Sequence, residues 1–188
     1  MTNRPILFSA PMVRALLDGR KTQTRRLAWR WRESTDGWRA DSVPTIWQRV
    51  KPGDRLWARE TWGEQRRGGL VYRADDLRAL GSSNPWRSPI HMPRQASRIT
   101  LTVTAVRVER LQEISEADAR AEGILFVPGH GHIKPADLAE GFSNYLNCTA
   151  GFADLWDDIH GPGSWSADPE VVVLTFDAMK HNIDEAKS

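Results

Sequence analysis

Tryptophan and arginine side chains are interleaved through the first half of the chain in a pattern that suits recognition of nucleobases. Seven of the nine tryptophans lie among the arginines of this half. The full set is Trp29, Trp31, Trp38, Trp47, Trp57, Trp62, Trp86, Trp156 and Trp165. Aromatic planes stack on bases, and guanidinium groups neutralise phosphates. The alternative is that the rings pack in the core or under arginine stems, so only the pattern as a whole indicates a basic, tryptophan-rich cleft.

The segment after Asp54 is a candidate wall of such a cleft. Alternation along a strand places Trp57 with Arg59 on one face, and Glu60 with Ala58 on the other. Arg59 or Glu60 is therefore expected to line the cleft, with Trp57 and, just beyond the strand, Trp62 beside it.

Arg94, Ser97 and Arg98 form a second polar cluster, just before the longest apolar strand pattern. Guanidinium and hydroxyl groups of this kind suit phosphate contact. The alternative is a surface loop of exposed arginines.

The segment from Gly19 to Arg26 reads Gly-Arg-Lys-Thr-Gln-Thr-Arg-Arg and is strongly basic. It has no apolar face, which predicts a solvated loop. In such a loop Arg20, Lys21 and Arg26 are candidates for contact with a ligand.

The elements that must position these groups are short. Helices are predicted over 11–19, closed by Gly19, over 115–122, where Ser115 and Asp118 resemble a capping box ended by Gly123, and over 142–159. Strands are predicted over 6–9, 55–60, 70–73, 98–110 and 171–176, and a short hairpin around Asp36-Gly37. The polar tail after Met179 is expected to fray.

The strand over 98–110 carries a slip in its alternation. Ile99, Leu101 and Val103 alternate with threonines, and the period then shifts by one residue at Ala105-Val106. Such a slip indicates a β-bulge in a sheet that curls into a barrel. We therefore expect Ile99, Leu101 and Val103, together with Val172 and Leu174, to point into the core.

Four stretches resemble the ASCH family of PUA-like domains, in particular its longer phage and prophage members. These are Gly19–Arg26, Lys51–Trp62, His91–Ile99, and Leu111–Glu122 together with the later Phe152–Trp156. The resemblance implies an α+β fold, a PUA-like small mixed β-barrel of five or six strands with two or three flanking helices. It also implies one domain over residues 1–180, with insertions near 27–50 and 127–147, followed by a polar tail over 181–188.

Small bacterial ASCH proteins that hydrolyse N(4)-acetylcytidine carry a similar Gly-Arg-Lys-Thr-x-Thr segment. The resemblance implies Lys21 as proton acceptor, Thr24 as nucleophile and Glu122 as proton donor. A threonine becomes a nucleophile only beside a base, and a lysine can serve as that base if burial and neighbouring cations lower its pKa. Because residues three apart in an ideal strand face opposite ways, the chain must bend between Lys21 and Thr24.

Simpler roles exist for each of the three residues. Lys21 would serve equally as a phosphate-binding cation, and Thr24 as a turn hydroxyl. Glu122, at a helix end where the dipole disfavours an anion, would serve as a salt-bridge partner of an arginine.

The leading hypothesis is thus an amidohydrolase acting on N(4)-acylated cytidine, without a cofactor. A non-catalytic RNA-binding module, a single-strand ribonuclease and a phage protein-interaction domain are the alternatives. The expected partner is a modified nucleoside or single-stranded RNA.

Cellular context follows from composition. The 188 residues carry a net charge of only +2, with arginines gathered early and acidic residues after Glu109. The single cysteine, Cys148, cannot form an internal disulfide, and no apolar run is long enough for a membrane span, so a cytoplasmic location is expected. His130 and His132 lie between glycines without a cysteine or acidic partner at ligand spacing, which argues against a metal site.

Overall fold

The computed structural model describes residues 2–34, 37–65, 68–75, 85–127, 131–133 and 145–185. A five-stranded mixed sheet with strand order β1-β5-β8-β11-β2 forms its centre. These strands are β1 (Asn3–Leu7), β5 (Arg55–Arg59), β8 (Thr100–Arg110), β11 (Glu170–Met179) and β2 (Gln23–Leu27). β1 pairs with β5 in parallel, and the other three pairs are antiparallel. The predicted α+β class is confirmed.

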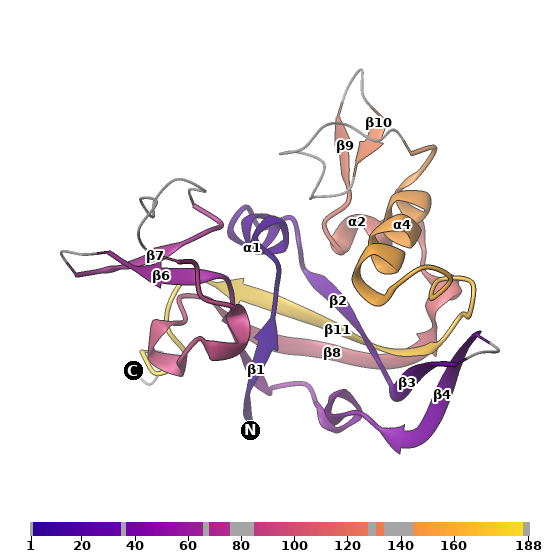
Figure 1. Cartoon of the computed structure of the whole chain (residues 1–188), viewed down its shortest axis with the longest axis horizontal. Helices are drawn as coiled ribbons and strands as arrows, with labels where there is room; N and C mark the ends of the chain where they lie inside the picture. The colour runs from indigo at the N-terminus through magenta and orange to yellow at the C-terminus, as the bar shows by residue number, and fades with distance from the viewer. Residues whose placement is uncertain are drawn as a thin grey trace.

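Three helices lie on one side of the long β8–β11 pair in Figure 1. They are α1 (Ala10–Leu17), α2 (Glu116–Ala121) and α4 (Cys148–His160). Two hairpins stand at opposite ends of the sheet (Figure 1), β3 (Trp29–Ser34) with β4 (Gly37–Pro44), and β6 (Trp62–Glu64) with β7 (Leu70–Tyr72). A third pair joins β9 (Leu125–Val127) to β10 (Gly131–Ile133). Single turns of 3₁₀ helix cover Ile46–Arg49, Pro89–His91, Arg94–Ala96 and Leu111–Glu113.

Local sequence signals explain the helix ends. The N-cap Ser115 accepts a hydrogen bond from the Asp118 backbone N–H at 3.1 Å, as predicted. Gly19 and Gly123 follow α1 and α2 with φ of +70° and +108°, the left-handed conformation that glycine adopts at a helix C-terminus. Both helices therefore end abruptly, and the chain turns back toward the sheet.

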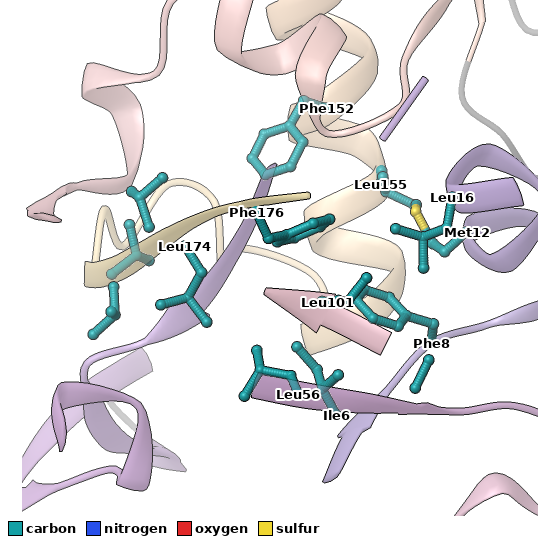
Figure 2. Packing of buried hydrophobic residues seen from close by; sticks show 14 of the residues in the cluster. Ile6, Phe8, Met12, Leu16, Leu56, Leu101, Phe152, Leu155, Leu174 and Phe176 are labelled. Carbon is teal, nitrogen blue, oxygen red and sulfur yellow. The ribbon is translucent and has the colours of Figure 1, made fainter. Parts of the chain in front are cut away.

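β8 is rich in threonine and valine, which favour strands, and it supplies the middle of the sheet. Opposite the consecutive Thr175 and Phe176, its ladder skips from Ala105 to Val103, so Thr104 is the extra residue. The structure thus places the bulge at Thr104, one residue before the predicted position at Ala105-Val106. The five residues predicted to face the core are all buried: Ile99, Leu101, Val103, Val172 and Leu174. Figure 2 shows Leu101 and Leu174 within this packed cluster.

Closure of the sheet into a barrel is not confirmed. Within the described residues no ladder joins the edge strands β1 and β2. A side chain links them instead, because Arg26 on β2 donates from its guanidinium to the Leu7 carbonyl at 2.8 Å.

Two expectations need correction, and a third is confirmed. The basic segment Gly19–Arg26 is not a solvated loop, since β2 begins within it at Gln23 and both Lys21 and Arg25 are buried. The hairpin predicted around Asp36-Gly37 is confirmed as the antiparallel pair of β3 and β4, although Asp36 itself lies outside the described residues. The tail does not fray directly after Met179, because Ile183 is buried and accepts a hydrogen bond from Arg55.

No helix among the described residues is long and apolar enough to cross a membrane.

Candidate functional site

Two helix ends bring Lys21 and Glu122 together. After α1 the backbone N–H groups of Arg20 and Lys21 both donate to the Ala15 carbonyl, which anchors Lys21 beside the helix end. Glu122 is the C-cap of α2, and the Thr22 N–H donates to the Ala121 carbonyl at 3.0 Å. Two residues 101 positions apart are thereby fixed in contact.

The Lys21 amine makes two short hydrogen bonds to Glu122. It donates to carboxylate Oε2 at 2.7 Å and to the backbone carbonyl at 2.8 Å. The side chains are only 2% and 4% exposed. A cation at a helix C-terminus also offsets the dipole that disfavours the Glu122 anion there. The simpler role considered for Glu122, a salt bridge, is thus real, with a lysine as its nearest cation.

Arg25 holds the other oxygen of the Glu122 carboxylate. Its fully buried guanidinium donates to Glu122 Oε1 at 3.2 Å, to Glu109 at 2.6 Å and to Asp118 at 3.2 Å. Gln23 accepts a further bond from Arg25 at 2.8 Å. Because each Glu122 oxygen has its own cation, the carboxylate has little freedom to rotate.

Burial acts on the protonation of Lys21. Desolvation lowers the pKa of the Lys21 ammonium, the Glu122 carboxylate opposes this, and the charges of Arg26 and Arg25 lower it further. The net direction is downward, which is the shift that a lysine base requires.

Thr24 borders the same cavity as Lys21 and Glu122. Lys21 precedes β2, whereas Thr24 is the second residue of that strand. Strand alternation therefore does not apply between them. The three residues predicted to act together all line one cavity.

The cavity has a volume of about 470 Å³, within the usual range for small-molecule sites. Apolar side chains form most of its wall: Leu7, Phe8, Met12, Pro89, Ile90, Phe152, Leu155, Trp156 and Ile159. Figure 2 shows Phe8, Met12, Phe152 and Leu155 as part of the packed core. The cavity thus combines a buried polar cluster with an apolar surround.

Sequence reasoning missed the wall that α4 provides. Trp156 and His160, four residues apart on this helix, line the cavity with ring centroids 4.1 Å apart. Burial, and then the charge of Arg26, lower the pKa of His160 to about 4, so the ring is neutral at pH 7. The signal that could have found this wall was the apolar spacing of Phe152, Leu155 and Ile159 beside the acidic face of the helix.

The predicted binding residues divide into two groups. Arg26 lies at the cavity, where its guanidinium stacks over Phe8 at 5.3 Å and Trp47 at 5.7 Å. Arg20 is paired with Asp18 at 2.8 Å and is not part of the cavity wall.

The remaining predicted residues are not brought to the cavity. Trp57 and Trp62 are buried, with Arg59 over Trp57 at 4.9 Å and Arg87 over Trp62 at 4.8 Å. These arginine and tryptophan side chains thus interact with each other within the fold.

Arg98 donates a bidentate pair of hydrogen bonds to the buried Glu60 carboxylate, at 2.8 and 3.0 Å, and a further hydrogen bond to Asp75 at 2.6 Å. Arg94 pairs with Asp184, and the Ser97 hydroxyl donates to the Ala58 carbonyl at 2.9 Å. All three stabilise contacts between segments that surround the end of β5.

No group of three or more metal-binding side chains occurs in the part of the chain that the structure describes. His130 and the His132 side chain lie outside that part.

Comparisons of this chain with family models, with curated proteins and with solved structures give no match.

Proposed function

We propose that this protein is an ASCH-type amidohydrolase that removes the acyl group from the exocyclic amine of an N(4)-acylated cytidine or a similar nucleoside. One observation carries the proposal: Lys21, Thr24 and Glu122 line one cavity, with the Lys21 amine 2.7 Å from the Glu122 carboxylate. The sequence resemblance at Lys21 and Thr24 supports the same assignment.

The buried pair can form a base and an acid without a change of net charge. A proton that moves from Lys21 Nζ to Glu122 Oε2 leaves a neutral amine and a carboxylic acid. Burial lowers the pKa of Lys21 from its ordinary value, which is the direction that favours this transfer.

Hydrolysis would then proceed in two balanced steps. The Lys21 amine takes the Thr24 hydroxyl proton as Thr24 Oγ1 bonds to the acyl carbon. The C–N bond breaks, and the Glu122 acid gives its proton to the departing amine of cytidine. Water next attacks the Thr24 ester and gives a proton to Glu122, while Lys21 returns a proton to the Thr24 oxygen. The neutral amine and the carboxylic acid are regenerated, and the free carboxylic acid leaves.

The contacts of the arginines favour a small substrate over an RNA strand. Arginines interleaved with tryptophans in the sequence predicted an RNA site, yet Arg59 and Arg87 stack on rings of the same chain. Arg94 and Arg98 are paired with carboxylates. A concave cavity with mainly apolar surface is typical of small-molecule sites.

A PUA-like ASCH domain of the phage and prophage type is part of the proposal, as is a cytoplasmic location. The mixed five-stranded sheet, with a bulge in its longest strand, supports the fold. The unpaired state of Cys148 agrees with a reducing compartment.

The test is release of cytidine from N(4)-acetylcytidine, measured by chromatography. We expect Lys21→Arg and Thr24→Val to lower kcat/KM by about a hundredfold or more, since each removes a group that takes part in bond making. Lys21→Arg retains the charge beside Glu122 but cannot become a neutral base. Lys51→Arg, at an exposed turn away from the cavity, is the matched control and should retain full activity.

An RNA-binding assay with single-stranded oligonucleotides decides the alternative. If no acylated nucleoside is cleaved and the Lys21→Arg protein binds RNA as well as the unchanged protein, the hydrolase proposal is wrong. Lys21 is then a phosphate-binding cation, and the protein is a non-catalytic RNA-binding module.

A further inference from the structure

The wall that α4 contributes to the cavity is almost entirely apolar. Phe152, Leu155 and Trp156 are buried on it, while Ile159, one turn beyond Leu155, is 57% exposed at the opening. His160 completes this face as a neutral ring stacked on Trp156. The wall therefore carries no charge at neutral pH.

Apolar side chains from other elements meet this wall at the cavity opening. Ile90 is 59% exposed and Leu7 is 48% exposed, and both line the same cavity as Ile159. Single exposed apolar residues are ordinary on protein surfaces, but three around one opening indicate a surface that a ligand covers. Thr24, Lys21 and Glu122 are buried behind this apolar opening.

The two halves of the proposed substrate differ in polarity. Cytosine and ribose are rich in hydrogen-bonding groups, and burial of such groups without partners is costly. The hydroxyl groups of Ser9, Thr61 and Ser88 line the cavity and are uncharged partners for that half. An acyl group has no such requirement beyond its carbonyl. An acetyl group has one methyl to bury against Ile90 and Ile159, whereas a larger apolar acyl group buries more apolar surface.

We propose, on the basis of the amide hydrolysis proposed above, that the preferred substrates carry a bulky apolar acyl group, aromatic or branched, which binds between α4 and Ile90. Phe152, Trp156 and Ile159 form one side of this acyl subsite, and Ile90 forms the other. The acyl subsite thus selects against acetyl.

The experiment compares N(4)-benzoylcytidine with N(4)-acetylcytidine as substrates. The unchanged protein should favour the benzoyl compound by about tenfold or more in kcat/KM, the size of effect that a hydrophobic pocket gives. The double variant Ile90→Ser, Ile159→Ser should lower the ratio of benzoyl to acetyl kcat/KM by about tenfold. Both side chains are more than half exposed, so these substitutions do not remove core packing.

Ile46→Ser is the matched control. Ile46 is 50% exposed in the 3₁₀ turn Ile46–Arg49 and does not line the cavity. This variant should leave the ratio unchanged. Acetyl cleavage as efficient as benzoyl cleavage, with a ratio that Ile90 and Ile159 do not influence, would overturn the acyl subsite and leave the hydrolase intact.

Binding to the Thr24→Val protein separates the two proposals. This variant retains the Lys21–Glu122 pair, and calorimetry gives the affinity for each compound without turnover. If neither compound is cleaved by any form of the protein, the hydrolase proposal is wrong. In that case the acyl subsite is still supported if the benzoyl compound binds at least tenfold more tightly than the acetyl compound and the Ile90 and Ile159 substitutions remove the difference. Equal affinities for the two compounds would overturn the acyl subsite.

Discussion

The Lys21–Glu122 pair should contribute strongly to stability, independently of any reaction. At 2.7 Å the two charges attract by about 6 kcal/mol for an effective dielectric constant of about 20, and desolvation of both groups offsets much of this. Removal of one partner leaves the other charge buried. Arg25 still pairs with Glu122 after Lys21→Met, whereas Glu122→Gln leaves the Lys21 ammonium buried beside a neutral amide. We therefore expect Glu122→Gln to lower the free energy of unfolding by about 3–5 kcal/mol.

A double-mutant cycle isolates the interaction. Glu122→Gln removes the negative charge, and the double variant Lys21→Met, Glu122→Gln removes both charges. The double variant should cost less than the sum of the single variants by about 1–3 kcal/mol, because neither charge is left alone. Urea unfolding at pH 7, followed by tryptophan fluorescence, gives each free energy.

The exposed pair of Arg94 with Asp184 is the control. These side chains are 37% and 53% exposed, and the same cycle there should give less than about 1 kcal/mol of coupling. Single variants at Lys21 and Glu122 whose effects add within about 0.5 kcal/mol would refute the reasoning. Such a result would mean that the buried geometry does not hold the two charges together.

Two further predictions concern His160 and the paired arginines. Because burial against Trp156 and the charge of Arg26 hold the pKa of His160 near 4 in the fold, and its ordinary value is 6.5, the unfolded chain binds an extra proton between these values. The free energy of unfolding should therefore fall by about 1–2 kcal/mol as pH is lowered from 7 to 5, for this partly exposed ring. The His160→Gln protein should lack this pH-dependent loss in urea unfolding. An unchanged pH dependence in that variant would contradict the lowered pKa of His160. Arg98→Ala should lower the free energy of unfolding by about 2–4 kcal/mol by leaving Glu60 buried without its partner, yet it should alter affinity for single-stranded RNA less than twofold. A tenfold loss of RNA affinity in filter-binding assays at fixed salt would show instead that this guanidinium contacts phosphate.

The sequence predicted best what local chemistry controls. Gly19 and Gly123 end their helices because glycine takes the left-handed conformation at little cost, and Ser115 caps α2 through its own hydroxyl. The slip in alternation near Ala105 predicted the bulge to within one residue of its position at Thr104, because side-chain direction along a strand is set residue by residue.

The candidate site was predictable only in part. The motif resemblance indicated Lys21, Thr24 and Glu122, and all three line one cavity. The residues expected beside them, such as Trp57, Glu60 and Arg98, lie in a separate network of stacked rings and ion pairs. Composition shows that arginines and tryptophans are abundant, but it does not show whether they meet a ligand or each other.

Only the tertiary structure decided that the basic segment Gly19–Arg26 has buried charges. Read alone, Lys21 and Arg25 have no apolar surroundings and belong in water. They are buried because Glu109, Asp118 and Glu122, 84 to 101 positions away in the chain, supply the opposite charges. A charge can leave water only where its counterions are already held in place. That compensation is a property of the assembled fold, whereas helix ends and strand alternation are properties of the chain itself.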